Sequence, residues 1–275
     1  MREGTAANLV RGQFGKILLR EYPAAYRRYF APISGAGFSL RPASAAPSRE
    51  LQGQSPSGFR DLPRPFVLRL AELESARFVI GVNLFEMHDP PLILFRDVLT
   101  RVACEGLGAS GLERVDGTER QNISLGPGTR NVTRVRVHFT TPTELKGVSE
   151  PDFGALFSRI RDRVSLLRAL YGDGPLEIDF RAMGERARAI AMTRCELHQE
   201  SAERYSRTQR GTHPLGGFTG VAEYEGDLTE FLPYLEVARW TGVGRQTVWG
   251  KGEIHCEPLW GGQSWLRADQ QVGLS

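Results

Sequence analysis

Apolar and polar residues alternate along residues 131–141, in the stretch NVTRVRVHFTT, and Pro142 follows it. A period of two is typical of a strand with one buried face, so this pattern predicts a half-buried strand that Pro142 closes. Over residues 152–172 the apolar positions change to helical spacing: Phe153, Leu156, Phe157, Ile160, Val164, Leu167 and Leu170. We expect a helix here, with Asp152 as its N-cap and Gly172 at its end.

The rest of the second half continues this alternation of element types. Two strand-like stretches follow, at about residues 187–197 and 218–224, then a helical pattern at 229–240 and a strand within 252–260. The predicted order is βαββαβ, which is the split βαβ of a ferredoxin-like (RRM-like) fold, an antiparallel four-stranded sheet backed by two helices.

The first half repeats this order imperfectly. The predicted elements are a helix, two strands, a second helix and a last strand, at residues 8–22, 63–70, 77–87, 91–106 and about 112–125. The first helix begins within about ten residues of Met1, which leaves no room for a strand ahead of it. The first strand of this half is therefore expected to be missing.

These elements predict an α+β protein of two tandem ferredoxin-like domains, residues 1–128 and 129–257, followed by a tail at 258–275. Residues 39–62 are rich in proline, serine and alanine, which is typical of a long flexible loop inside the first domain.

Composition narrows the class of protein without naming a function. The chain has 275 residues, of which 40% are hydrophobic and 24% charged, as in a globular protein with an ample core. It contains no apolar run of about 20 residues and no signal-peptide pattern, so we expect a cytoplasmic protein that does not bind membranes. The three scattered cysteines do not suggest a disulfide framework.

The positive charges are almost all arginines. Lysine occurs only at Lys16, Lys146 and Lys251, which leaves 35 − 3 = 32 arginines, and the net charge is +3. Arginine pairs bidentately with phosphate and stacks on bases, so this bias suits an RNA partner. A GC-rich genome would produce the same bias, and both explanations stay open.

The stretch GVGRQTVWGKG, residues 242–252, holds four glycines, Gly242, Gly244, Gly250 and Gly252. It follows a predicted helix and precedes a strand, which is the reverse of a dinucleotide-binding fingerprint, and no Ser or Thr follows the Gly-Lys pair as a P-loop requires. The loop has two open interpretations: backbone N–H groups that contact an RNA phosphate, or a tight connection that lets a helix and a strand pack closely.

The loop, together with the layout, resembles the RAMP superfamily of CRISPR-associated proteins. It fits the pattern Gly-hydrophobic-Gly, five residues, Gly-x-Gly, with Arg245 as the basic residue among the five, and it departs from it only at Lys251, where the pattern prefers an apolar residue. Four further stretches are similar to the sixth Cas family, the CRISPR repeat-RNA-processing endoribonucleases: LVRGQFGKIL, PRPFVL, RYSRTQ and GGFTGVAEYEGDLTEFLPYLEVARWTGVG.

This resemblance implies a metal-independent nuclease without a cofactor, which cuts the repeat in a CRISPR precursor transcript. RNA supplies its own nucleophile, the 2′-hydroxyl, so a base, an acid and cations suffice to cleave it. The implied partners are repeat RNA and guide RNA, with other Cas effector subunits and a homodimer left open. The alternative is a catalytically silent subunit that binds guide RNA inside an effector complex.

The family commonly places a catalytic histidine in the first domain, but this chain has none before His88. The stretch at residues 198–217 offers a replacement, since cations, a ring and two imidazoles lie together there. The alternative is a solvated loop with ordinary surface histidines. The predicted catalytic residues are His213, His198 and Tyr205. The predicted RNA-binding residues are Arg204, Arg207, Arg210, Gly242, Gly244, Arg245, Gly250, Lys251 and Gly252.

Other residues have weaker functional interpretations. Tyr26 and Tyr29 could donate protons, although tyrosines beside a helix are more often packing residues. His138 is expected to face away from the core, and His88 to lie in a turn. Cys195, His198, His255 and Cys256 could be drawn as a zinc site, but they lack the close Cys-x2-Cys spacing of such sites, so we predict no metal.

Overall fold

The computed structural model describes residues 3–32, 62–74, 77–106, 117–126, 131–200, 203–206, 211–214 and 216–259. Its helices are α1 (Glu3–Glu21), α2 (Pro23–Ala25), α3 (Leu92–Arg101), α4 (Phe153–Tyr171), α5 (Phe180–Arg188) and α6 (Leu232–Thr241), with π-helical turns at Tyr26–Phe30 and Val102–Gly106 and a 3₁₀ turn at Thr247–Trp249. Its strands are β1 (Phe66–Glu74), β2 (Arg77–Leu84), β3 (Arg134–Thr143), β4 (Ala191–Glu200), β5 (Glu203–Ser206), β6 (Gly211–Pro214), β7 (Gly217–Glu225) and β8 (Ile254–Pro258). The mixed α/β class with antiparallel sheets is confirmed.

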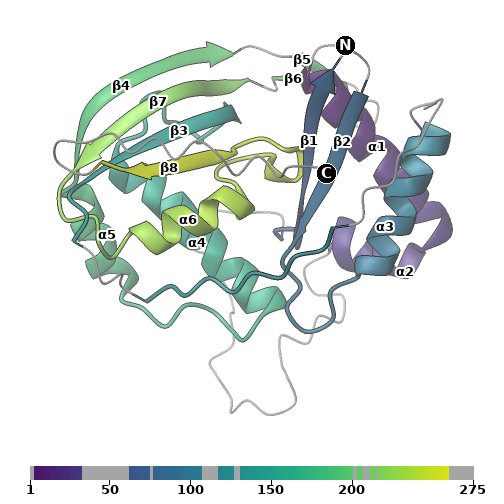
Figure 1. Cartoon of the computed structure of the whole chain (residues 1–275), viewed down its shortest axis with the longest axis horizontal. Coiled ribbons are helices and arrows are strands. Elements are labelled where there is room, and N and C mark those ends of the chain that lie inside the picture. Colours follow the sequence, from purple (N-terminus) through teal and green to yellow (C-terminus); the bar gives the residue numbers. More distant parts are fainter. Residues whose placement is uncertain are drawn as a thin grey trace.

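The second half of the chain forms an antiparallel four-stranded sheet in the order β4-β7-β3-β8. Because α4 connects β3 to β4 and α6 connects β7 to β8, this is the split βαβ arrangement that the sequence predicts. Figure 1 shows the helices gathered on one side of this sheet. The alternation in β3 has the expected consequence, since Val135, Val137 and Phe139 are buried against the helices.

The helix α4 begins where the sequence predicts, because the Asp152 carboxylate accepts a hydrogen bond from the Ala155 N–H at 2.9 Å. Its apolar positions meet the sheet and α6 through an aromatic cluster, in which the rings of Phe157 and Phe231 lie 4.7 Å apart and those of Phe153 and Tyr224 lie 5.2 Å apart. Edge-to-face pairs of this kind add to the burial of apolar area.

The short helix α5 is not predicted by the sequence analysis. Asp179 caps its start by accepting from the N–H groups of Arg181 and Ala182. Only Met183 and Ala187 are buried in it, so it lacks the broad apolar stripe by which we recognised α4. The following strand therefore begins at Ala191 rather than at residue 187.

The first half contains the hairpin β1–β2 together with α1, α2 and α3. Its core is aromatic, with the ring of Phe95 lying 5.1 Å from those of both Phe14 and Phe66. The expected strand at 112–125 is wrong for residues 117–125, which form no strand, because this stretch is polar and largely exposed and has no apolar alternation to bury. Residues 107–116 lie outside the described residues.

The two halves meet at the C-terminal end of α6. Its last carbonyl groups have no partner within the helix, and they accept hydrogen bonds from three side chains outside it: Arg69 to Arg239 O at 2.9 Å, Asn83 to Trp240 O at 3.0 Å and Arg163 to Thr241 O at 2.9 Å. Burial lowers the pKa of Arg163 to about 10, so this side chain stays protonated at neutral pH and its charge suits the negative end of the helix dipole.

No helix within the described residues combines the length and the apolar character that crossing a bilayer requires.

Candidate functional site

A β-ribbon extends from one end of the four-stranded sheet. Strands β4 and β7 pair as far as Glu200 opposite Gly217, and between them in the chain β5 and β6 pair from Glu203 opposite Pro214. In the view of Figure 1, β5 and β6 lie beyond the ends of β4 and β7, toward α1 and β1. The ribbon therefore projects toward the first half of the chain.

The ribbon brings several of the predicted site residues to neighbouring positions. Arg204 in β5 is directly opposite His213 in β6, and Tyr205 is opposite Thr212. The Cα atoms of such opposed residues lie about 4.5–5.5 Å apart. Arg207 and Arg210 lie outside the described residues. His198 is exposed on β4, opposite Thr219.

The glycine loop, residues 242–252, needs its glycines for packing. All four have positive φ, at +69°, +84°, +80° and +67° in chain order, which L-residues rarely adopt. A Cβ atom on Gly244 would overlap the backbone carbonyl of Glu144, and one on Gly252 would overlap that of Val243. Substitution at either position therefore perturbs folding before it tests any contact with RNA.

Several backbone N–H groups of this loop are already occupied within the protein. The N–H of Val243 donates to Gly252 O at 2.8 Å, that of Gly252 to Pro142 O at 3.2 Å, and that of Arg245 to Glu144 O at 3.0 Å. Val248 joins the core of the first half, and the Arg11 guanidinium lies 4.3 Å from the centre of the Trp249 ring. These contacts favour the second interpretation of the loop, a tight connection, and they also tie the two halves together.

Lys251 is the cation that this loop places next to the ribbon. Its ammonium group donates to Gly216 O at 3.2 Å, just before β7 begins. The side chain is half-buried, and this burial lowers the pKa of Lys251 to about 8, while Glu144 and Glu200 act in the opposite direction. Glu144 is also engaged by Arg245, at 2.6 Å. A lysine in this state is mostly protonated at neutral pH but can release its proton.

The face of the sheet away from the helices carries a histidine pair. His138 in β3 is directly opposite His255 in β8, with ring centres 6.3 Å apart, which confirms that His138 faces away from the core. Burial, then the charges of Arg239 and His138, lower the pKa of His255. His138 lies 3.5 Å from the Glu257 carboxylate.

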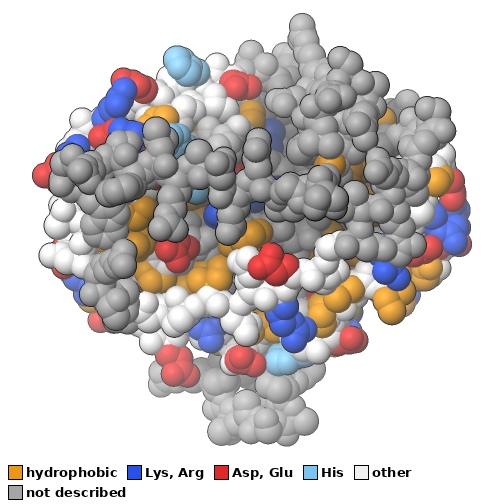
Figure 2. Space-filling view, in the orientation of Figure 1, with side chains coloured by type: hydrophobic (Ala, Val, Ile, Leu, Met, Phe, Trp, Pro, Cys, Tyr) orange, Lys and Arg blue, Asp and Glu red, His pale blue; other side chains and the backbone are white. Residues whose placement is uncertain are grey.

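The arginines on this face are paired with glutamates. Arg136 contacts Glu223 at 2.8 Å, and Arg134 and Arg194 reach the same carboxylate at 3.5 and 3.4 Å. Burial alone would raise the pKa of Glu223, but the hydrogen bond and charge of Arg136 lower it below its ordinary value. In Figure 2 acidic and basic side chains are interspersed over the described part of the face shown. These arginines are therefore already engaged when an anionic strand approaches.

The residues that could be drawn as a zinc site do not come together. Cys195 and His198 lie on β4, whereas His255 and Cys256 lie on β8, and these are the two edge strands of the sheet. At roughly 4.8 Å between neighbouring strands, the edges are about 14 Å apart. Within the described part of the chain, no three His, Cys, Asp or Glu side chains are grouped as a metal would require.

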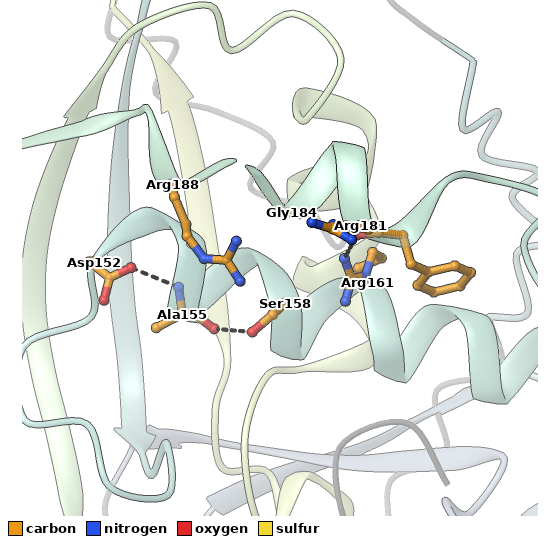
Figure 3. Close-up of a pocket in the computed structure, with 9 residues that line it drawn as sticks. Asp152, Ala155, Ser158, Arg161, Arg181, Gly184 and Arg188 are labelled. Atoms are coloured by element: carbon orange, nitrogen blue, oxygen red, sulfur yellow. Dashed lines mark hydrogen bonds between the residues drawn. The ribbon is translucent and has the colours of Figure 1, made fainter. Parts of the chain in front are cut away.

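A groove of about 410 Å³ lies between α4 and α5 and includes Arg161, Arg181 and Arg188 in its lining (Figure 3). The guanidinium of Arg161 is held by Asp162 at 2.9 Å and donates to Phe180 O at 2.7 Å. Arg181 pairs with Glu185 at 3.1 Å. The positive charge of the groove is thus partly neutralised by its own helices.

Comparison with known proteins shows a family likeness in the second half of the chain. Residues 137–254, from β3 into β8, match the family model described as CRISPR-associated endoribonuclease Cas6. The match covers 118 of the 275 residues, so it shows a likeness to Cas6 over this part of the chain. The matched region includes the ribbon, with His213, and the whole glycine loop, and it agrees with the resemblance seen in the sequence. No match was found among curated proteins.

Solved structures show a likeness of fold over most of the chain. The chain is similar to a Thermus thermophilus Cas6 in a product complex, with 18% identity, a TM-score of 0.54, and coverage of 91% of this chain and 93% of that one. A second Cas6 product complex has 18% identity and a TM-score of 0.49 over 91% of this chain and 92% of that one. At this identity the likeness concerns the fold.

The tyrosines that follow α1 pack against the core of the first half. Tyr29 is buried, and burial raises its pKa. Tyr26 stacks on Phe30 at 5.1 Å between ring centres. These contacts favour the packing role over proton donation.

Sequence reasoning missed the residues that hold the loop in place. Arg69, Asn83 and Arg163, which bind the end of α6, come from β1, β2 and α4, so their contacts with the loop region span 78 or more positions along the chain. No local pattern signals a contact of that range. The residues around Lys251 were missed for the same reason, since Glu144 and Glu200 belong to other strands or their ends.

Proposed function

We propose that the protein is a metal-independent endoribonuclease that cleaves the repeat RNA of CRISPR precursor transcripts to give guide RNAs. The observation that carries this proposal is the match of residues 137–254 to the Cas6 endoribonuclease family, because the match contains both the ribbon and the glycine loop. We assign two functional domains, residues 1–128 and 129–257, with the cleavage site where the ribbon approaches the first domain.

The chemistry uses the 2′-hydroxyl next to the cut phosphate as the nucleophile. A base removes its proton, an acid protonates the 5′ oxygen, and cations stabilise the charge that develops on the phosphate. The products are a 2′,3′-cyclic phosphate and a 5′-hydroxyl. Holding the hydroxyl in line with the bond that breaks supplies a large part of the rate.

His213 is the proposed base, with Tyr205 or His198 as its second partner. The register of the ribbon supports this assignment, because it sets Arg204 directly opposite His213 and so brings a cation position next to the imidazole position. Arg204, Arg207 and Arg210 are proposed to contact RNA phosphates, since arginine pairs bidentately with phosphate.

The glycine loop is proposed to act on RNA through its two cations rather than through its glycines. Arg245 is 61% exposed although it pairs with Glu144, and Lys251 lies beside the ribbon. Gly242, Gly244, Gly250 and Gly252 hold these cations in place by permitting a close backbone approach. Guide RNA and other Cas subunits are the expected partners after cleavage.

Incubation of the purified chain with end-labelled repeat RNA in EDTA tests the proposal. We expect a single cut that leaves a 2′,3′-cyclic phosphate, and no cut when the nucleotide that supplies the hydroxyl is replaced by its 2′-deoxy form. Tight binding without cleavage would replace the proposal with a silent guide-binding subunit. A chain that neither binds nor cuts the RNA would overturn both.

A further inference from the structure

The chain places a lysine at a loop position that lies against the base of the ribbon, although it uses arginine for 32 of its 35 cations. The two side chains differ in a way that matters for catalysis. A guanidinium stays charged at every working pH, whereas an ammonium group can donate its proton. A position that only needs positive charge could use arginine, as most of this chain does.

The backbone around Lys251 fixes where its ammonium group lies. Gly250 and Gly252 flank it with positive φ, the Gly252 N–H bonds to Pro142 O, and the Lys251 Nζ bonds to Gly216 O. Gly216 follows His213 by three residues, so their Cα atoms are at most about 11 Å apart, the reach of a fully extended chain. The Lys251 ammonium group therefore lies near the base of the strand that carries His213.

Among the described residues, the two glutamates that act on Lys251 have other partners. The ammonium group can therefore contact a substrate. Glu144 is bound by Arg245 at 2.6 Å, and Glu200 accepts a hydrogen bond from the Thr219 hydroxyl at 3.0 Å. The ammonium group itself donates to a neutral carbonyl, Gly216 O. Two of its three protons are thus left for other acceptors.

We infer that Lys251 is the general acid of the cleavage reaction, with its ammonium group in contact with the phosphate that is cut. This inference rests on the proposed function. The 2′-hydroxyl gives its proton to the base in the ribbon, the 2′-oxygen forms a bond to phosphorus, and the bond between phosphorus and the 5′ oxygen breaks. The departing oxygen takes a proton from Lys251, and the neutral amine that remains is protonated again by water.

The partial burial of Lys251 suits this role. An acid works best when its pKa is close to the working pH, and burial lowers the pKa of Lys251 to about 8. Because the acid must carry its proton, the contribution of Lys251 to the rate should be lost as the pH rises above this value. Among the described residues, Glu144 just after β3 and Glu200 at the end of β4 are the charged groups that act on this side chain, and both keep its pKa from falling further. Arg245 in the loop pairs with Glu144.

The variants Lys251→Gln and Lys251→Arg test the inference in single-turnover cleavage, once the cut position of the wild type is mapped. We expect Lys251→Gln to slow cleavage at least a hundredfold, with repeat binding changed less than threefold. Lys251→Arg should keep the binding, remain slow and lose the fall in rate above about pH 8. Lys146→Gln is the matched control, since Lys146 is exposed in the turn after β3, and it should cleave as the wild type does.

A substrate with sulfur in place of the 5′ oxygen at the cut separates acid catalysis from a structural role. A thiolate leaves without being protonated, so the Lys251→Gln variant should cut this substrate within about tenfold of the wild-type rate. A variant that cuts both substrates equally slowly, or an Lys251→Arg variant with full activity, would overturn the inference. A wild type that cuts no repeat RNA would instead overturn the proposed function.

Discussion

Replacing Gly252 by alanine should destabilise the whole chain, because the end of the loop after α6 packs here against the start of the same loop. At Gly252 the backbone has φ +67°, and a Cβ atom there would overlap the Val243 carbonyl. The same two residues are joined by the hydrogen bond from the Val243 N–H to Gly252 O. Alanine therefore strains the backbone and pushes the two ends of the loop apart.

The expected cost can be added from its parts. A left-handed conformation costs an L-residue roughly 1–2 kcal/mol. Moving the backbone apart weakens two hydrogen bonds, Val243 N–H to Gly252 O and Gly252 N–H to Pro142 O, at about 1 kcal/mol each. Together these give about 3–4 kcal/mol, a large part of the roughly 5–15 kcal/mol by which a typical domain is stable.

Urea unfolding followed by circular dichroism measures this loss, and Gly250→Ala is the matched control. Gly250 has φ +80° in the same loop, but its nearest neighbour to an added Cβ is Leu68 O at 3.1 Å, so only the conformational cost of about 1–2 kcal/mol applies. If Gly252→Ala and Gly250→Ala unfold at the same urea concentration with equal slopes, the close approach of the backbone does not limit this loop and the reasoning fails.

The remaining predictions concern the ribbon and the sheet. The triple variant of Arg204, Arg207 and Arg210 to alanine should make the salt dependence of repeat binding shallower by about one unit of log–log slope per lost phosphate contact, and an unchanged slope would exclude these contacts. The variant His213→Ala should slow single-turnover cleavage at least a hundredfold, whereas a near wild-type rate would exclude His213 as the base. The lowered pKa of Glu223 stabilises the fold above the unfolded value of about 4.3, and this contribution is lost as the pH falls through the folded pKa. Glu223→Gln should therefore flatten the pH dependence of the unfolding midpoint below about pH 4.3.

The sequence predicted the elements whose pattern is local and strong. The alternation in β3 and the helical spacing in α4 follow directly from which residues face the core, and the Asp152 cap is a contact over three residues. The helix α5 was missed because it buries only two side chains. The strand expected at 112–125 was wrong over residues 117–125 because this stretch is polar and largely exposed, with only Ile123 and Leu125 partly buried.

The candidate site was harder to predict because it is assembled from distant segments. The stretch with Arg204 and His213 was recognised from composition, and the register of the ribbon adds that the two positions are opposed. The bond from Lys251 to Gly216 O spans 35 residues and depends on how the loop folds over β3, which no spacing rule gives. The sequence could mark Lys251 only as a departure from the pattern of the family.

This departure points to where chemistry can lie in the glycine loop. Its glycines are explained by packing, since each has positive φ and Gly244 and Gly252 lie against backbone carbonyl groups, so their presence follows from the fold. The buried Val243 and Val248 are explained in the same way. Packing does not require an ammonium group at Lys251. Half-burial removes part of the water around this charged group, and that costs free energy. A residue whose type the fold does not demand, and whose placement costs free energy, is a better candidate for function than the glycines that make the loop recognisable.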